Sequence, residues 1–351
     1  MKAIEIHGHT GDSTIYIGEC LRNLKKYVPS EQTIVMTDAV VRHYYGGEFP
    51  SGTIIELGTG EGIKTLDTAR AVYGKLMDLE ADRATFIIGI GGGIVCDVAG
   101  FVASTYMRGL RFGFVPSTLL AQVDASTGGK NGVNYDGFKN MVGVFNQPDF
   151  VVCDLNLLKT LPQVEIRCGL AEIVKHAAIA DAGLFSYLED HCEKARGIHM
   201  GVMEKLVTES VRIKSSIVNR DEKERGERRK LNFGHTLGHA VENASGLPHG
   251  EAVGAGMAFA ARLSARMGYL STEEAGRIET LLTNLGLPTR LPLAGARVLE
   301  ALKRDKKKEG EKIHFVLLHG IGRAVVEQMD LRELGDILQD MEKESFVGRR
   351  S

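Results

Sequence analysis

The feature that most constrains the fold of this chain is a buried strand that leads directly into a cluster of glycines and then into a helix. Thr85–Ile90 is almost wholly apolar, as expected of a buried strand. Gly91-Gly92-Gly93 follows it, and a helical pattern begins at about Ile94. A strand, a glycine-rich turn and a helix in this order are typical of a parallel α/β fold. The first half of the chain is therefore predicted to be an α/β domain.

Other segments of the first half extend this alternation. The strand-like segments are Ala3–Ile6, Thr33–Asp38, Phe112–Pro116 and Phe150–Asp154, and Thr65–Leu79 has helical periodicity. Strands separated by helical segments form parallel sheets, so we expect these strands to lie in one mainly parallel sheet.

The character of the sequence changes after Leu161-Pro162. From Ile166 to about Gly268 the periodicity is helical throughout, and Lys312–Leu318 is a single later β-like piece. A length of 351 residues also suggests about two domains. We predict an α/β domain over residues 1–160 and a helical domain over residues 161–351.

Composition excludes several classes of protein. With 43% hydrophobic and 25% charged residues the chain can bury a large core, and its net charge of −2 argues against nucleic acid or an anionic membrane as the main partner. The longest apolar stretch, Ala252–Ala261, is too short to span a bilayer. The five cysteines form no CxxC pair, which favours reduced thiols. We expect a cytoplasmic protein.

The glycine-rich turn is a candidate nucleotide site. Backbone amides in Gly89–Asp97 can cradle a pyrophosphate, because the absence of Cβ lets the ligand approach and the helix N-terminus favours anions. The pattern departs from GxGxxG, since Ile94 occupies the third glycine position. A tight turn without a ligand is the alternative. Asp38, at the end of an earlier strand, supports the nucleotide interpretation because an acid there can bind a ribose hydroxyl.

A second glycine-rich segment, Gln122–Asn134, is followed by Lys139-Asn140. Its glycines, lysines and amides suit a phosphorylated or anionic substrate. It lacks the spacing of an ATP-binding P-loop. The alternative is a flexible surface loop with solvated lysines.

Three histidines form the clearest candidate for a metal site. His235 and His239 are four residues apart, so a helix would project them from one face, and the Pro-Gly-containing segment Leu247–Glu251 can bring His249 back to them. Neutral imidazole is a common ligand for catalytic divalent metals. A solvated helix N-terminus is the alternative, but three histidines favour a metal or catalytic cluster.

A further candidate ligand precedes these histidines. Glu172, Lys175 and His176 share one face of a predicted helix, a pattern that is usually a solvated salt-bridge stripe. Beside the histidine cluster, Glu172 becomes a candidate for the carboxylate of a His-His-Glu metal site that keeps one position open for substrate.

Taken together, these segments resemble the 3-dehydroquinate synthase family, NAD- and zinc-dependent enzymes of the shikimate route to aromatic amino acids. The resemblance runs from about Asp38 to Lys308 and rests on an ordered set of motifs: GGGIVCDVAGF, TYMRG, PSTLLAQVDASTGGKNGVN, KNMVG, KTLP, GLAEIVKH, RIK, LNFGHTLGHA, HGEAV and DKK. It implies a Rossmann-like NAD-binding α/β domain followed by an all-α metal-binding domain.

The resemblance also implies roles for individual residues. The metal, zinc or cobalt, would be bound by Glu172, His235 and His249, and His239 would contact substrate instead. NAD would be bound by Asp38, Glu61, Lys64, Gly92, Gly93, Ile94, Asp97, Ser117, Thr118, Asp124, Lys130, Lys139, Thr160, Leu161 and Glu165. Substrate contacts would come from Asp124, Lys130, Asn140, Lys175, Lys214, Glu224, Arg228, Asn232, His235, His239 and either Lys306 or Lys307. Arg108 would reach the active site of a neighbouring subunit, which implies a homodimer.

The implied reaction converts 3-deoxy-D-arabino-heptulosonate 7-phosphate to 3-dehydroquinate and phosphate. The sequence departs from the common family pattern at Ala125, Asn131, Phe138 and His176, and none of these changes removes a charged group or a ligand. Three alternatives stay open: another sugar phosphate cyclase of the inosose or valiolone type, a metal-dependent polyol dehydrogenase, and an inactive NAD- or metal-binding regulator.

Overall fold

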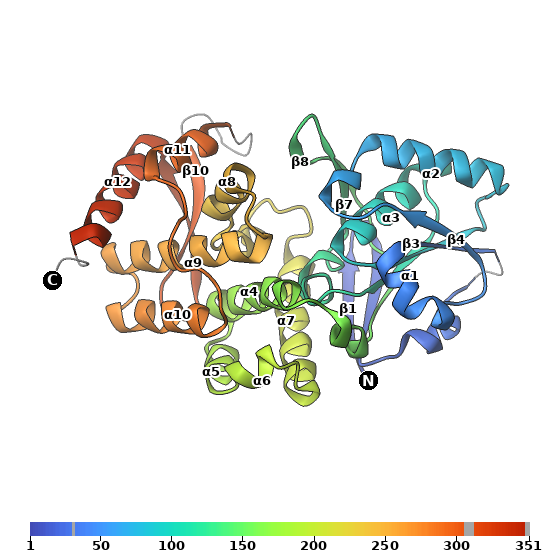
Figure 1. The fold of residues 1–351 in the computed structure, drawn as a ribbon, viewed down its shortest axis with the longest axis horizontal. Helices are drawn as coiled ribbons and strands as arrows, with labels where there is room; N and C mark the ends of the chain where they lie inside the picture. The colour runs from blue at the N-terminus through green and yellow to red at the C-terminus, as the bar shows by residue number, and fades with distance from the viewer. Residues whose placement is uncertain (30–31, 305–311, 348–351) are drawn as a thin grey trace. The chain divides into compact units, whose positions relative to one another are not determined.

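The structure is a computed structural model that describes residues 1–29, 32–304 and 312–347 (Figure 1). The chain forms two compact units. Unit 1 comprises Met1–Gly169 and Ile198–Lys223, and unit 2 comprises Leu170–Gly197 and Glu224–Ser351. The predicted domains, residues 1–160 and 161–351, were defined by what they would bind, and this division stays a prediction. Lys306 and Lys307 lie outside the described residues.

Unit 1 is built on a seven-stranded sheet in the part of the chain that the structure describes. The strand order is β1 (Lys2–Gly8), β2 (Gly11–Ile17), β9 (Phe150–Cys153), β6 (Phe112–Pro116), β5 (Phe86–Gly91), β3 (Thr33–Asp38) and β4 (Thr53–Leu57). Neighbouring strands pair in parallel apart from β1 and β2, which form an antiparallel hairpin at one edge. The predicted parallel α/β fold is confirmed.

Among the described residues, the α-helices of unit 1 are α1 (Ala39–Tyr45), α2 (Leu66–Asp78), α3 (Gly93–Thr105), α7 (Met200–Arg220) and the first part of α4 (Gln163–Ala180). A separate hairpin joins β7 (Lys130–Tyr135) to β8 (Phe138–Phe145). Every residue of β5 is buried, and Phe86, Ile88 and Ile90 pack in one cluster with Val35 and Val115 of the adjoining strands. This core fixes the turns that follow the strands, where the predicted nucleotide-binding residues lie.

Unit 2 is mainly helical, as predicted. Its helices are the later part of α4 (Gln163–Ala180), α5 (Ala182–Asp190), α6 (Cys192–Arg196), α8 (His235–Ser245), α9 (His249–Arg266), α10 (Thr272–Asn284), α11 (Gly295–Arg304) and α12 (Leu331–Val347). Helix α9 is largely buried, and it packs against α8, α10 and β10 (Figure 1). No helix among the described residues is long and apolar enough to span a membrane.

The expectation of an all-α second domain needs one addition. The β-like piece at Lys312–Leu318 is strand β10, and it pairs in antiparallel register with β11 (Ala324–Asp330). The sequence Ala324–Asp330 contains two charged residues and a glutamine and has only two buried positions, so it carries little of the apolar signal of a strand.

Candidate metal centre and cofactor site

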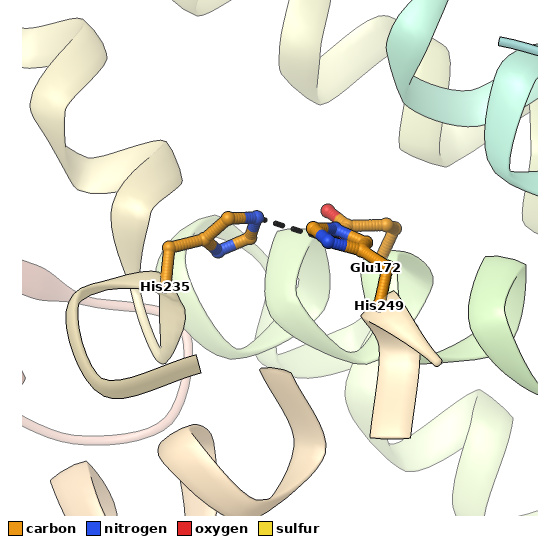
Figure 2. Close-up of side chains that lie close together, drawn as sticks. All are labelled: Glu172, His235 and His249. Carbon is orange, nitrogen blue, oxygen red and sulfur yellow. Dashed lines mark hydrogen bonds and ion pairs between the residues drawn. The ribbon is translucent and has the colours of Figure 1, made fainter. Parts of the chain in front are cut away.

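Three ligand-type side chains of unit 2 point toward one another (Figure 2). They are Glu172 from α4, His235 at the first position of α8 and His249 at the first position of α9. The Glu172 Oε1 atom lies 3.4 Å from His235 Nε2 and 3.3 Å from His249 Nε2. One ligand atom of each residue lies within 4.8 Å of the other two, which is the spacing of a cluster that could hold a metal ion.

Glycines bring the two histidine-bearing helices close together. Gly234 precedes His235 with a left-handed φ of +78°, which favours glycine. A Cβ on Gly256 of α9 would stand 2.1 Å from the Gly234 carbonyl oxygen, and a Cβ on Gly238 would stand 3.0 Å from the Val253 Cα. Helices α8 and α9 can therefore touch backbone to backbone, so that their first residues, His235 and His249, face the same carboxylate.

The hydrogen bonds of the imidazoles leave the facing nitrogens available as ligands. His235 Nδ1 lies 3.2 Å from the Phe233 carbonyl oxygen, and His249 Nδ1 lies 3.1 Å from Glu242 Oε2. A carbonyl and an ionised carboxylate can only accept, so each Nδ1 is the donor. A cation that takes the place of the Nε2 proton of His249 would leave each imidazole neutral, with its Nε2 lone pair free to bind the metal. Two imidazole nitrogens and one carboxylate oxygen are the donor set of catalytic zinc sites that keep a position open.

The buried charge of Glu172 is compensated by its neighbours. Its side chain is 0% exposed and forms an ion pair with the buried Lys175. Burial lowers the pKa of His235, although Glu172 opposes this shift. Burial would also lower the pKa of His249, but hydrogen bonds to Glu172 and Glu242 raise it to about 10. Positive charge is therefore favoured at His249, between Glu172 and Glu242, but not at His235.

The sequence predicted that three imidazoles could converge, and all three rings are neighbours. The His239 ring centroid lies 5.2 Å from that of His235 and 6.0 Å from that of His249. A ligand atom of His239 also groups with Glu242 and His249 in a second possible cluster. Among the described residues, the possible ligand cluster that contains His235 and His249 has Glu172 as its third member. The three histidines do not form such a cluster by themselves.

The predicted nucleotide turn is a close backbone approach at the carboxyl end of β5. Gly92 caps α3 without a side chain, and a Cβ there would stand 3.2 Å from the Thr118 methyl group. A Cβ on Gly93 would stand 3.1 Å from the Ala125 Cβ. The absence of Cβ at both glycines therefore lets Thr118 and Ala125 pack against the turn. The turn leads into a helix N-terminus, which favours an anion such as a pyrophosphate. Asp38 ends β3 and uses its Oδ1 atom to cap α1 through Val40 and Val41.

Two lysines of unit 1 that were predicted to bind cofactor or substrate form ion pairs. Lys64 donates to both Asp97 and Asn140. Burial raises the pKa of Asp97, and the Lys64 ammonium opposes that rise. Lys214 donates to the Asp124 carboxylate and, at 2.6 Å, to the Asp124 carbonyl oxygen. The structure thus brings Lys64 to Asp97 and Asn140, and Lys214 to Asp124.

The remaining predicted residues of unit 1 are spread along its turns and strands. Glu61 accepts from Asn134 at 2.7 Å, and the Thr160 hydroxyl lies 2.7 Å from that of Tyr45. Ser117 is buried, Lys130 begins β7 and Lys139 lies in β8. Ile94 lies in the first turn of α3, and Glu165 lies in the first turn of α4. Leu161 directly follows a short 3₁₀ helix.

Three predicted site residues have strained backbones. Among the described residues, seven non-glycine residues have positive φ, and Arg108 (+69°), Asn140 (+55°) and Glu224 (+56°) are three of them. Such conformations cost energy and concentrate at functional sites. In unit 2, Glu224 accepts from Asn232 at 2.6 Å, and Arg228 is buried nearby in sequence.

Sequence reasoning missed Glu242, which contacts the Nδ1 atom of His249. A signal was present, because residues 235, 239 and 242 share one face of a helix. That spacing alone did not separate Glu242 from an ordinary solvated acid.

Family models match most of the chain. The N-terminal model of 3-dehydroquinate synthase matches residues 54–168, and the C-terminal model matches residues 169–308. The chain belongs to the 3-dehydroquinate synthase family. It is 40% identical to a 3-dehydroquinate synthase of Dehalococcoides mccartyi (strain CBDB1) over 98% of this chain and 99% of that protein. It is 43% identical to one of Halorhodospira halophila (strain DSM 244 / SL1) over 89% and 91%.

Solved structures give the same picture of the fold. A 2-deoxy-scyllo-inosose synthase complexed with carbaglucose-6-phosphate, NAD+ and Co2+ has a TM-score of 0.86 at 26% identity, with 97% of this chain and 100% of that chain covered. ValA, a 2-epi-5-epi-valiolone synthase from Streptomyces hygroscopicus subsp. jinggangensis 5008 with NAD+ and Zn2+ bound, has a TM-score of 0.86 at 28% identity, with 98% and 100% covered. A probable glycerol dehydrogenase from Sinorhizobium meliloti 1021, at 17% identity and a TM-score of 0.68 over 98% and 100%, shares the fold.

Proposed function

We propose that this protein is a 3-dehydroquinate synthase, which converts 3-deoxy-D-arabino-heptulosonate 7-phosphate to 3-dehydroquinate and phosphate. The observation that carries the proposal is the Glu172, His235 and His249 cluster in a chain that is about 40% identical, over nearly its full length, to proteins of that name. The inosose and valiolone synthases are less similar, at 26% and 28% identity, so those activities are the second choice.

The chemistry needs a temporary ketone, because loss of phosphate requires an acidic C–H beside a carbonyl. When bound, NAD would supply the acceptor for a hydride from the carbon that bears a ring hydroxyl and would return this hydride after phosphate loss, while zinc or cobalt would act as a Lewis acid that lowers the pKa of the hydroxyl, which gives up its proton. Glu172, His235 and His249 would hold the metal and leave one position for substrate. Glu172 is then committed to the metal, so it does not act as the free base.

The chain's cations suit a substrate that carries two anionic groups. We assign the phosphate to Lys130, Lys139, Arg108 and His239, and the carboxylate to Lys214 and Arg228. Arg228 is buried, and a guanidinium stays charged and can bind a carboxylate through two parallel hydrogen bonds. A substrate that bears a carboxylate as well as a phosphate needs these extra cations. This favours the heptulosonate phosphate over a sugar phosphate that has no carboxylate.

Phosphate release tests the proposal directly. The purified protein should release phosphate from the heptulosonate phosphate only with NAD and divalent metal present, and a chelator should stop the reaction. NAD should act catalytically, without net reduction. Stoichiometric reduction of NAD would indicate a polyol dehydrogenase, and release from a hexose 6-phosphate alone would indicate another cyclase.

We also propose a homodimer that works in the cytoplasm. Arg108 is exposed on a left-handed turn, and the hairpin of β7 and β8 exposes Tyr135, Phe138, Met141 and Phe145. An exposed apolar hairpin of this kind supports self-association. Mixing inactive Arg108→Ala and His249→Ala chains should restore part of the activity if Arg108 serves a neighbouring subunit. No recovery from a mixed dimer would contradict that role.

The proposed location in the cytoplasm is supported by the five cysteines, which form no disulfide. Thiols stay reduced in that compartment.

A further inference from the structure

Glu242 contacts a proposed metal ligand but has no role in the family resemblance. It lies on α8, seven residues after His235, and its side chain is 12% exposed. Its Oε2 atom lies 3.1 Å from His249 Nδ1, on the opposite side of the imidazole from Nε2, which lies 3.3 Å from Glu172 Oε1. The ring of His249 is therefore held between two carboxylates that come from different helices.

The two histidines differ in what fixes their orientation. His235 is buried, and its Nδ1 faces the backbone carbonyl of Phe233, two residues earlier in the chain. The His249 side chain is 29% exposed, and the partner of its Nδ1 is a side chain on another helix. Burial and a local carbonyl hold the first ring, whereas the second depends on a removable carboxylate.

We propose that Glu242 is a positioning residue of the metal site. Its carboxylate accepts a hydrogen bond from the Nδ1–H group of His249 and so directs the Nε2 lone pair toward the metal. This inference rests on the proposed function. An ionised carboxylate can only accept, so its contact fixes the tautomer in which Nε2 is free to bind metal. Ligating histidines commonly donate their second N–H to a carboxylate, and loss of such a partner lowers metal affinity roughly 10–100-fold.

The alternative is that Glu242 is itself a ligand, since His239, Glu242 and His249 form a second possible cluster. A conservative variant separates the two roles. In Glu242→Gln the amide oxygen can still accept the Nδ1 proton, but a carboxylate ligand is lost. A positioning residue should thus tolerate glutamine and not alanine.

The experiment titrates the metal-free full-length protein with Co2+ or Zn2+ alone, without substrate, and follows heat and the visible absorption of Co2+. Glu242→Ala should weaken binding roughly 10–100-fold and alter the Co2+ spectrum, and Glu242→Gln should stay within a few-fold of the unmodified protein. Glu279→Ala, which removes a carboxylate paired with Arg262 in the same unit, is the matched control and should bind normally. Circular dichroism checks that each variant is folded.

The outcomes separate this inference from the proposed function. Equal losses in Glu242→Gln and His249→Ala would overturn the positioning role in favour of direct ligation. Normal binding by Glu242→Ala, with binding lost in His249→Ala, would overturn the positioning role and leave the ligand set intact. Normal binding by His249→Ala would overturn the ligand set itself, and the role of Glu242 with it.

Discussion

The two units hold their proposed site residues on different kinds of backbone. In unit 1 these residues are spread over turns, helices and a hairpin, and two of the lysines pair with separate carboxylates, Lys64 with Asp97 and Lys214 with Asp124. In unit 2 they lie on helices, and a single buried carboxylate, Glu172, is shared by a lysine and two histidines. A site of independent pairs should lose function in steps, whereas a site built around one shared carboxylate should lose function at once.

The largest expected effect is the loss of a ligand from unit 2. His249→Ala should lose the metal and with it several kcal/mol of transition-state stabilisation, about a thousandfold or more in kcat/KM. NAD binding by unit 1 should persist, because the ligand belongs to the other unit. Metal analysis, phosphate release and NAD binding measure the three quantities. A fully active, metal-free variant would rule out the ligand set.

The next effect tests whether helix contact sets the metal geometry. Gly256→Ala would place a Cβ 2.1 Å from the Gly234 carbonyl oxygen, and backbone atoms there cannot yield as a flexible side chain can. We expect a loss of about 1–3 kcal/mol in the free energy of unfolding, with weaker metal binding as α8 and α9 separate. Gly276→Ala is the control, because nothing lies within 4 Å of its Cβ position. It should be neutral or stabilising in urea unfolding, and equal behaviour of the two variants would remove the role assigned to close helix contact.

The sequence predicted the buried strands far better than the exposed ones. The sequence predicts Thr33–Asp38 and Phe112–Pro116 with the observed bounds, because each has an apolar centre and nearly all of its residues are buried. The sequence does not predict strands β7 and β8, since Lys130–Tyr135 is polar and glycine-containing and lacks the apolar pattern of a strand. The turn between them, Asp136-Gly137 with φ of +50° and +79°, is a typical hairpin signal.

The candidate site divides in a similar way. Helical spacing predicted that His235 and His239 share a face, and their rings are indeed neighbours. Spacing could not show which nitrogen of each ring faces Glu172, because this depends on Phe233 and Glu242 as acceptors. The ligand set itself came from the family resemblance. The geometry agrees with it, and metal binding by these residues stays a proposal.

A smaller effect is expected at the cofactor turn of unit 1. Gly92→Ala would place a Cβ 3.2 Å from the Thr118 methyl group, which a small shift can relieve, so the fold should persist. The shift would move the backbone amides of the turn away from their positions for binding the pyrophosphate. Loss of one charge-assisted hydrogen bond, about 1.5 kcal/mol, corresponds to about tenfold weaker NAD binding.

Fluorescence titration with NAD would measure this change, and metal binding should be unaltered. Gly74→Ala in α2 is the control, because its Cβ position has no neighbour within 4 Å. A complete loss of activity in Gly92→Ala, comparable with that of His249→Ala, would contradict the stepwise behaviour expected of unit 1.

The smallest effect concerns a carboxylate of unit 1 that has no proposed site role. Glu19 is buried and accepts from Tyr27 at 2.6 Å and from Asn23 at 2.8 Å. These hydrogen bonds lower the pKa of Glu19 to about 2, below its ordinary value of 4.5. A carboxylate whose pKa is lower in the folded than in the unfolded state stabilises the fold above the unfolded pKa, and this stabilisation is lost as the pH falls from about 4.5 toward 2.

Glu19→Gln should therefore cost on the order of 1–2 kcal/mol in the free energy of unfolding at pH 7 and much less near pH 2.5, with activity at pH 7 unchanged. Urea unfolding at both pH values measures the difference. An equal cost at the two pH values would show that packing, and not the charge, stabilises this site. Because Glu19 is held by neutral donors and Glu172 by a lysine and two imidazoles, only Glu172 is placed to exchange its partners for a cation.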